Sequence, residues 1–118
     1  MKRKHSLYAK DMLDAINQIE KFTDGMSLAQ FQEDDKTSSA VVRKLEIIGE
    51  AAKNVPSDIK QKNKAIPWSD MAKTRDKIIH GYFGVDYDII WKTVKEKLPE
   101  IKTPLKNLLK ELEKQEKN

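Results

Sequence analysis

Apolar residues in this sequence recur three and four positions apart, the spacing that places side chains on one face of a helix. We expect long helices over about 6–23, 36–54 and 87–97, and a final helix that opens at Pro99 or Pro104. The apolar face of the first is Tyr8, Met12, Ala15, Ile16, Ile19 and Phe22, and that of the second is Val41, Val42, Leu45, Ile48, Gly49 and Ala52. The later faces are Ile90, Trp91 and Val94, then Ile101, Leu105, Leu108, Leu109 and Leu112.

The composition agrees with a helical fold. Charged residues make up 36% of the chain, and only 4 glycines and 4 prolines interrupt it. This argues against disorder and against a β-sandwich. The length of 118 residues allows one modest core. We therefore expect one all-α domain over 1–118, a bundle of four long helices plus short ones, in which the charged tail 113–118 frays.

Several classes of protein are disfavoured. There is no cysteine, which excludes disulfides, a thiolate nucleophile and a cysteine-based zinc site. No glycine-rich phosphate loop or cluster of metal ligands appears, so we expect no cofactor and no metal. No apolar run follows the basic start to make a signal peptide, and none is long enough to span a membrane, which favours the cytoplasm. The net charge of +4 is compatible with RNA as a partner.

Chemistry-bearing residues gather between Met71 and Gly84. Pro67 suits the first position of a helix, and Gly81 suits the position just past its end. Asp76 and His80 are four residues apart on that helix, so the carboxylate can orient the imidazole and raise its pKa. Arg75 and His80 are five apart, about 140° around an ideal helix and roughly 7.5 Å along it. They cannot both point at one small target from a single rigid helix.

Two copies of this helix at a symmetric dimer interface would solve that problem, because each residue is then presented twice. Two histidines can remove the proton of a ribose 2′-hydroxyl and protonate the leaving oxygen, and an arginine can neutralise charge on the phosphate. These residue types therefore suit cleavage of RNA without metal. The alternative, which the spacing alone favours because it is the more common role of such residues at a helix end, is that Arg75 and His80 form only a helix C-cap and a surface salt bridge.

A family resemblance favours the first interpretation. Arg75-x-x-x-x-His80-x-Tyr82 resembles the signature of the HEPN superfamily, and the chain looks most like the HepT toxins, which are encoded beside an MNT-type nucleotidyltransferase antitoxin. The runs AVVRKLEIIGEAAKNV (40–55) and IPWSDMAKTRDKIIHGYFGVDYDIIWKTV (66–94) and the leucine-rich final helix follow in that family's order and spacing. The resemblance covers almost the whole chain.

The resemblance implies a HEPN-type homodimer and a metal-independent endoribonuclease, the toxin of a type VII toxin–antitoxin module. Arg75 and His80 would be catalytic, Asp76 would support them, and Tyr82 would accept AMP from the cognate nucleotidyltransferase. The chain lacks the acidic metal ligands that the antitoxin itself would need. The competing possibility is a non-catalytic helical subunit that binds nucleotide or the neighbouring protein.

Other polar groups leave alternatives open. Arg43, Glu46 and Glu50 would form a salt-bridge ladder on one helix, or a glutamate would buttress Arg75. The lysines of the predicted loop 56–66 would be solvated or would hold RNA phosphates; they are Lys60, Lys62 and Lys64. Trp68 and Trp91 are expected to be core or dimer anchors rather than base-stacking platforms. Local capping is expected from Ser27 with Gln30 and from Asp86.

Overall fold

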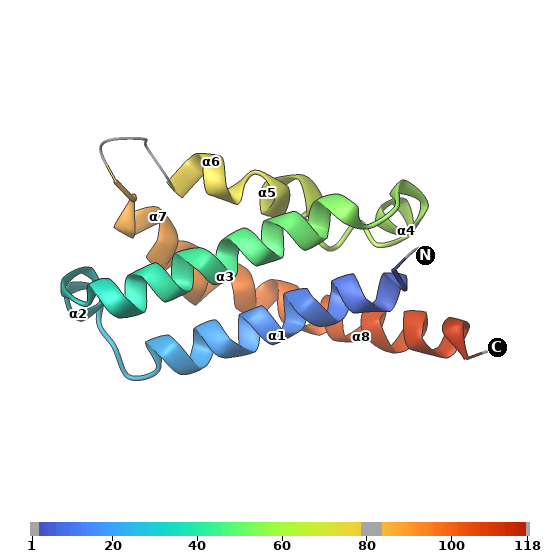
Figure 1. Cartoon of the computed structure of the whole chain (residues 1–118), viewed down its shortest axis with the longest axis horizontal. Helices are drawn as coiled ribbons and strands as arrows, with labels where there is room; N and C mark the ends of the chain where they lie inside the picture. Colours follow the sequence, from blue (N-terminus) through green and yellow to red (C-terminus); the bar gives the residue numbers. More distant parts are fainter. Residues whose placement is uncertain (1–2, 79–83, 118) are drawn as a thin grey trace.

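Three long helices run side by side along the molecule (Figure 1). The computed structural model describes residues 3–78 and 84–117, and for Arg75 the backbone alone. The long helices are α1 (His5–Thr23), α3 (Asp35–Asn54) and α8 (Leu98–Glu116), and α1 contacts both of the others. The elements of the described residues are helical, which confirms the all-α prediction. None of their helices has the length and apolarity needed to cross a bilayer.

Shorter helices close the two ends and one side of this layer. Helix α2 (Leu28–Glu33) packs against α3 and begins with the expected capping box, in which Ser27 and Gln30 bond each other's backbone N–H. Helices α5 (Trp68–Ala72) and α6 (Thr74–Ile78) lie over α3. Helix α4 (Ser57–Lys62) lies in the segment that we expected to be a loop, so that expectation was wrong.

The C-terminal part of the chain is one long helical run. Helix α7 (Tyr87–Lys92) is capped by Asp86 as predicted, and a π-helical segment (Thr93–Lys97) leads straight into α8. Pro99 lies in the first turn of α8, whereas Pro104 lies inside the helix, so a start at Pro104 was wrong. Pro99 has no N–H to close the α-helical bond to Lys95, and Lys95 lies in the π-helical segment, where the bonding pattern is already shifted.

The core joins the inward faces of the long helices to the short ones. The largest fully buried side chains are Phe31, Met12, Ile16, Ile19, Ile66, Ile78, Ile90 and Leu105. Phe22 is an exception to the predicted stripe, because its side chain is 39% exposed. It lies about 120° around α1 from Ile16, which carries it away from the face that packs on α3 and α8. The indole of Trp68 is buried and donates to the Asn63 carbonyl at 3.1 Å, as expected of a core residue.

The two ends of the chain meet at one end of the bundle (Figure 1). The Ser6 hydroxyl donates to Glu116 Oε1 at 2.6 Å, and the Ser6 backbone N–H donates to Oε2 at 3.2 Å. This N–H belongs to the first turn of α1, where no intrahelical acceptor exists. The carboxylate of Glu116 thus satisfies the start of α1, and α8 continues to that residue, through the tail that we expected to fray.

Candidate active site and the groove beside it

The segment that carries the Arg-x-x-x-x-His signature is two short helices rather than one. α5 ends at Ala72, and α6 begins at Thr74, so the continuous helix predicted from Pro67 to His80 was wrong. The Thr74 hydroxyl donates to the Asp70 carbonyl at 2.9 Å, four residues back. A threonine that bonds this carbonyl competes with the backbone ladder and bends a helix. Pro67 is the N-cap of α5 rather than its first residue.

A close backbone contact fixes this pair of helices on the bundle. Gly49 of α3 is buried against α5, and a Cβ built on it would lie 2.9 Å from the Met71 carbonyl oxygen. Met71 is itself buried, and Ile78 at the end of α6 is fully buried. Gly49 therefore permits the close approach of α5 to α3. Helix α3 thus packs against both helices of the signature segment.

The structure places the predicted catalytic residues only in part. Arg75 lies in α6, with its backbone described, and Asp76 follows it there with an exposed side chain. His80 and Tyr82 lie outside the described residues, so the predicted pairing of Asp76 with His80 stays a prediction. Within the described ranges, the Asp76 carboxylate has no hydrogen-bond or ion-pair partner.

The described residues on either side of the signature's end lie together. The Asp86 backbone N–H donates to the Ile78 carbonyl at 2.8 Å, which joins the last residue of α6 to the cap of α7. The Asp86 carboxylate in turn accepts from the Ile89 N–H at 3.1 Å. Chain positions 78 and 86 are therefore held in contact, and α6 and α7 pack against each other.

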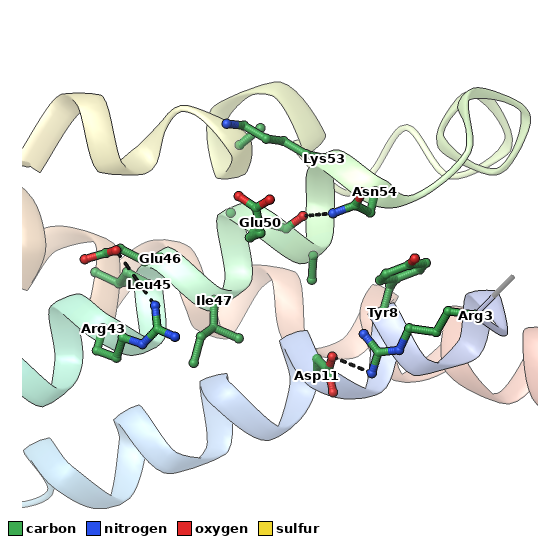
Figure 2. A pocket seen from close by; sticks show the side chains of 13 residues that line it. Arg3, Tyr8, Asp11, Arg43, Leu45, Glu46, Ile47, Glu50, Lys53 and Asn54 are labelled. Atoms are coloured by element: carbon green, nitrogen blue, oxygen red, sulfur yellow. Dashed lines mark hydrogen bonds and ion pairs between the residues drawn. The ribbon is translucent and has the colours of Figure 1, made fainter. Parts of the chain in front are cut away.

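A groove of about 410 Å³ runs beside this segment, between α1 and α5 over the outer face of α3. Figure 2 shows its polar lining, which comes from the N-terminal segment, α1 and α3. The lining side chains that carry charge are Arg3, Asp11, Arg43, Glu46, Glu50 and Lys53. Ala72, three residues before Arg75, lines the edge formed by α5. The groove therefore borders the signature segment directly.

Charges within the groove are partly paired. Arg3 Nη2 lies 2.8 Å from Asp11 Oδ2, and the Arg3 guanidinium also covers the ring of Tyr8, with Cζ 5.0 Å from the ring centroid. Arg43 Nη1 lies 4.0 Å from Glu46 Oε2, one step of the predicted ladder. The alternative, in which a glutamate buttresses Arg75, is not tested because the Arg75 side chain is not described.

The three lysines of the segment after α3 differ in their contacts and positions. The Lys60 ammonium donates to the Lys53 carbonyl at 3.5 Å and so joins α4 to the end of α3. Lys62 and Lys64 are exposed, and Lys62 faces a different hollow, near the chain termini. Only Lys60 of the three predicted phosphate-binding lysines is thus brought beside the groove.

Sequence reasoning missed Arg3, Tyr8 and Lys53 as possible functional residues. Tyr8 counted only as part of an apolar stripe, and Arg3 only as part of a basic start. A polar tip on an otherwise apolar face, three to five positions from a basic residue, was the available signal.

Trp91 is half-buried as a packing residue, with its ring centroid 5.2 Å from that of Phe31.

A metal site has no support among residues 3–78 and 84–117, where no group of three or more potential ligands is found. Among the described residues, the titratable groups with clearly shifted pKa values lie outside the groove and α6. Hydrogen bonding and ion pairing with Asp14 raise the pKa of Lys10, and hydrogen bonds from Thr37 lower the pKa of Asp34. Both are structural contacts on helix surfaces.

Comparison with known proteins gives one consistent family. The model of the family described as "Ribonuclease HepT-like" matches residues 12–108. A "Probable ribonuclease HepT" of Thermococcus cleftensis is 51% identical over 110 residues, which cover 93% of this chain and 100% of that protein. Two proteins of Methanocaldococcus jannaschii named "Putative RNase" are 43% identical over 108 residues (92% of this chain, 89% of that protein) and 41% identical over 117 residues (99% and 97%). No solved structure matches the chain.

Proposed function

This chain belongs to the HepT-like family, and we propose that it is a metal-independent endoribonuclease, the toxin of a type VII toxin–antitoxin module. The observation that carries the proposal is the combination of family membership with the signature residues Arg75, His80 and Tyr82. The family match spans these positions, and the relatives are named as ribonucleases. Those names favour the enzyme over a non-catalytic helical subunit.

The proposed reaction is an internal transesterification of RNA. His80 takes the proton of the ribose 2′-hydroxyl, whose oxygen forms a bond to phosphorus as the bond to the 5′-oxygen breaks. An imidazolium protonates that leaving oxygen, so the products are a 2′,3′-cyclic phosphate and a 5′-hydroxyl. Arg75 neutralises the charge that builds on the non-bridging oxygens. Asp76 orients the imidazole.

A homodimer supplies the second histidine. Arg75 and His80 lie about 140° apart on an ideal helix, so one protomer presents them poorly to a single phosphate. In the dimer, a shared cleft contains two arginines and two histidines. Support comes from the position of α6 at the side of the bundle, with Asp76 exposed to solvent.

Neutralisation by a cognate MNT-type nucleotidyltransferase completes the proposal. The Tyr82 hydroxyl attacks the α-phosphorus of ATP, pyrophosphate leaves, and the phenolic proton is released. The transferred AMP adds bulk and a phosphodiester charge two residues from His80. This charge competes with the RNA phosphate for Arg75 and silences the enzyme.

The experiment is to incubate the purified chain with a 5′-labelled RNA in EDTA and to analyse the new ends. We expect cleavage that persists in the chelator and yields 2′,3′-cyclic phosphate and 5′-hydroxyl ends. Cleavage that is lost on chelation and restored by a divalent metal contradicts the metal-free mechanism. No cleavage of any RNA, together with stable binding of nucleotide or of the neighbouring protein, supports the non-catalytic alternative.

A further inference from the structure

Basic side chains border the groove of Figure 2. Arg3 lines it where α3 ends, and the Lys60 ammonium of α4 lies beside that end through its bond to the Lys53 carbonyl. Lys53 also lines the groove, with its side chain running toward α5 above Glu50 (Figure 2). Among the described residues neither Lys53 nor Lys60 forms an ion pair. The two ammonium groups are therefore available to a phosphate backbone, and lysine contacts of this kind supply most of the affinity for nucleic acid without sequence preference.

The same end offers a stacking surface. Tyr8 is half-buried in the groove wall, and the Arg3 guanidinium lies over its ring, with Cζ 5.0 Å from the centroid. Bases of single-stranded RNA stack on tyrosine rings and on guanidinium planes. Asp11 forms an ion pair of 2.8 Å with this guanidinium, which favours its position over the ring.

Carboxylates also line the groove, together with Arg43, which pairs with Glu46. Glu46 and Glu50 line it, and the Glu50 carbonyl accepts from the Asn54 side-chain amide at 2.9 Å. Carboxylates repel phosphate, but they accept hydrogen bonds from the exocyclic amino groups of bases. A strand whose phosphates lie at Lys53 and Lys60 can thus turn its bases toward Tyr8 and Glu50.

We propose that this groove binds a single-stranded stretch of the RNA substrate beside the cleaved bond, with phosphates at Lys53 and Lys60 and a base stacked on Tyr8 and Arg3. The proposal rests on the proposed ribonuclease function. It adds a binding surface outside the signature, and Ala72 at the edge of this surface is three residues before Arg75 in sequence. The number of nucleotides beside the cleaved bond, rather than the nucleotides at the bond itself, would then determine the affinity for an RNA.

The test is the binding of a fluorescein-labelled single-stranded 12-mer with 2′-O-methyl riboses, which lacks the hydroxyl that the proposed reaction needs. Fluorescence anisotropy is measured over a range of salt concentrations. Lys53→Gln with Lys60→Gln should lower the slope of log affinity against log salt by about 1.4, since each phosphate contact on a single strand contributes about 0.7. Lys106→Gln with Lys110→Gln, on the exposed face of α8, removes the same charge elsewhere and serves as the control.

Stacking is tested in the same assay. Tyr8→Leu should weaken binding about fivefold or more, as expected when one stacked base is lost. Tyr8→Phe keeps the ring and should bind within about twofold of the wild type. Circular dichroism checks that both variants are folded, and the lysine pair keeps the proposal testable if Tyr8→Leu is not.

Three results would overturn the proposal. The first is wild-type affinity in the groove variants, and the second is an equal loss of affinity in the α8 control pair. The third is a molecular mass of the groove variants that differs from that of the wild type in light scattering, which would show that a second copy covers the groove. Cleavage of a dinucleotide too short to reach Tyr8 separates the two claims. If the wild type cleaves it and the groove variants do so equally, the ribonuclease function stands whatever the binding assay shows.

Discussion

Gly49 of α3 and Met71 of α5 approach so closely that a Cβ on Gly49 would lie 2.9 Å from the Met71 carbonyl oxygen. The contact is between backbones, which cannot move aside as the tip of a flexible side chain can. It therefore sets the distance between α5 and α3, and with it the position of α6, which follows α5 in the chain. Arg75 is carried by that second helix, so a core contact bears directly on the proposed site.

Gly49→Ala should destabilise the protein and impair cleavage. Overpacking of this kind costs about 1–3 kcal/mol, whereas replacing a helical glycine by alanine gains about 1 kcal/mol. We expect a net loss of about 1 kcal/mol in the free energy of unfolding, measured by urea denaturation. Ser39→Ala, at an exposed position of α3, is the control for helix propensity. A variant as stable and as active as the wild type would show that α5 adjusts without consequence.

Much of this arrangement could be predicted from local chemistry. The caps at Ser27 and Asp86 and most of the inward faces of α1, α3 and α8 follow from residue type and spacing alone. These features depend mainly on residues within one or two turns of the same helix.

The differences arise where distant parts of the chain meet. The tail was expected to fray because residues 113–118 are charged, but Glu116 bonds Ser6, which is 110 positions away in sequence. Helix α4 forms in a lysine-rich segment whose sequence has no apolar periodicity from which a helix could be predicted. The groove is assembled from the N-terminal segment, α1, α3 and α5, so no single stretch of sequence could place Lys53 in the same groove as Arg3 and Tyr8.

Asp34 should make a pH-dependent contribution to stability. Its carboxylate caps α3 by accepting from the Thr37 backbone N–H at 2.9 Å and from the Thr37 hydroxyl at 2.8 Å. These bonds lower its pKa from the usual 3.8. A carboxyl with a lowered folded-state pKa stabilises the protein above its unfolded pKa, and this contribution is lost as pH falls through the folded value.

Asp34→Asn, which can still cap a helix but does not titrate, tests this. The difference in unfolding free energy between wild type and variant should be constant above about pH 5 and should shrink as pH falls below about 4. Urea denaturation at several pH values measures it, and Glu33→Gln controls for the loss of one negative charge. A difference that does not change with pH would contradict the role assigned to the charged cap.

Tyr82→Phe should escape neutralisation. The substitution keeps the ring and removes the hydroxyl that would attack ATP, so the variant should remain toxic when the cognate nucleotidyltransferase is coexpressed. Intact-mass measurement should find one or more AMP groups on the wild type, and peptide mapping should place them at Tyr82. If Tyr82→Phe is silenced as well as the wild type and the mapped tyrosine is unmodified, inhibition acts by binding alone.

A shared active site makes the dimer obligatory. Light scattering should report about twice the 13.6 kDa of one chain. Mixing Arg75→Ala protomers with His80→Ala protomers should restore part of the activity, because a heterodimer retains one intact copy of each residue across the interface. Each variant alone, at the same total concentration, is the control. A stable monomer with full activity would refute the shared cleft.

The most direct measurement is the single-turnover rate of RNA cleavage by Arg75→Ala and His80→Ala in EDTA. We predict that each loses at least about 100-fold in rate, because in the proposed reaction Arg75 stabilises charge in the transition state and His80 transfers the proton. Helical content and molecular mass should match the wild type, and Lys106→Ala should cleave normally. Wild-type rates in both Arg75→Ala and His80→Ala would contradict the ribonuclease site proposed for this chain.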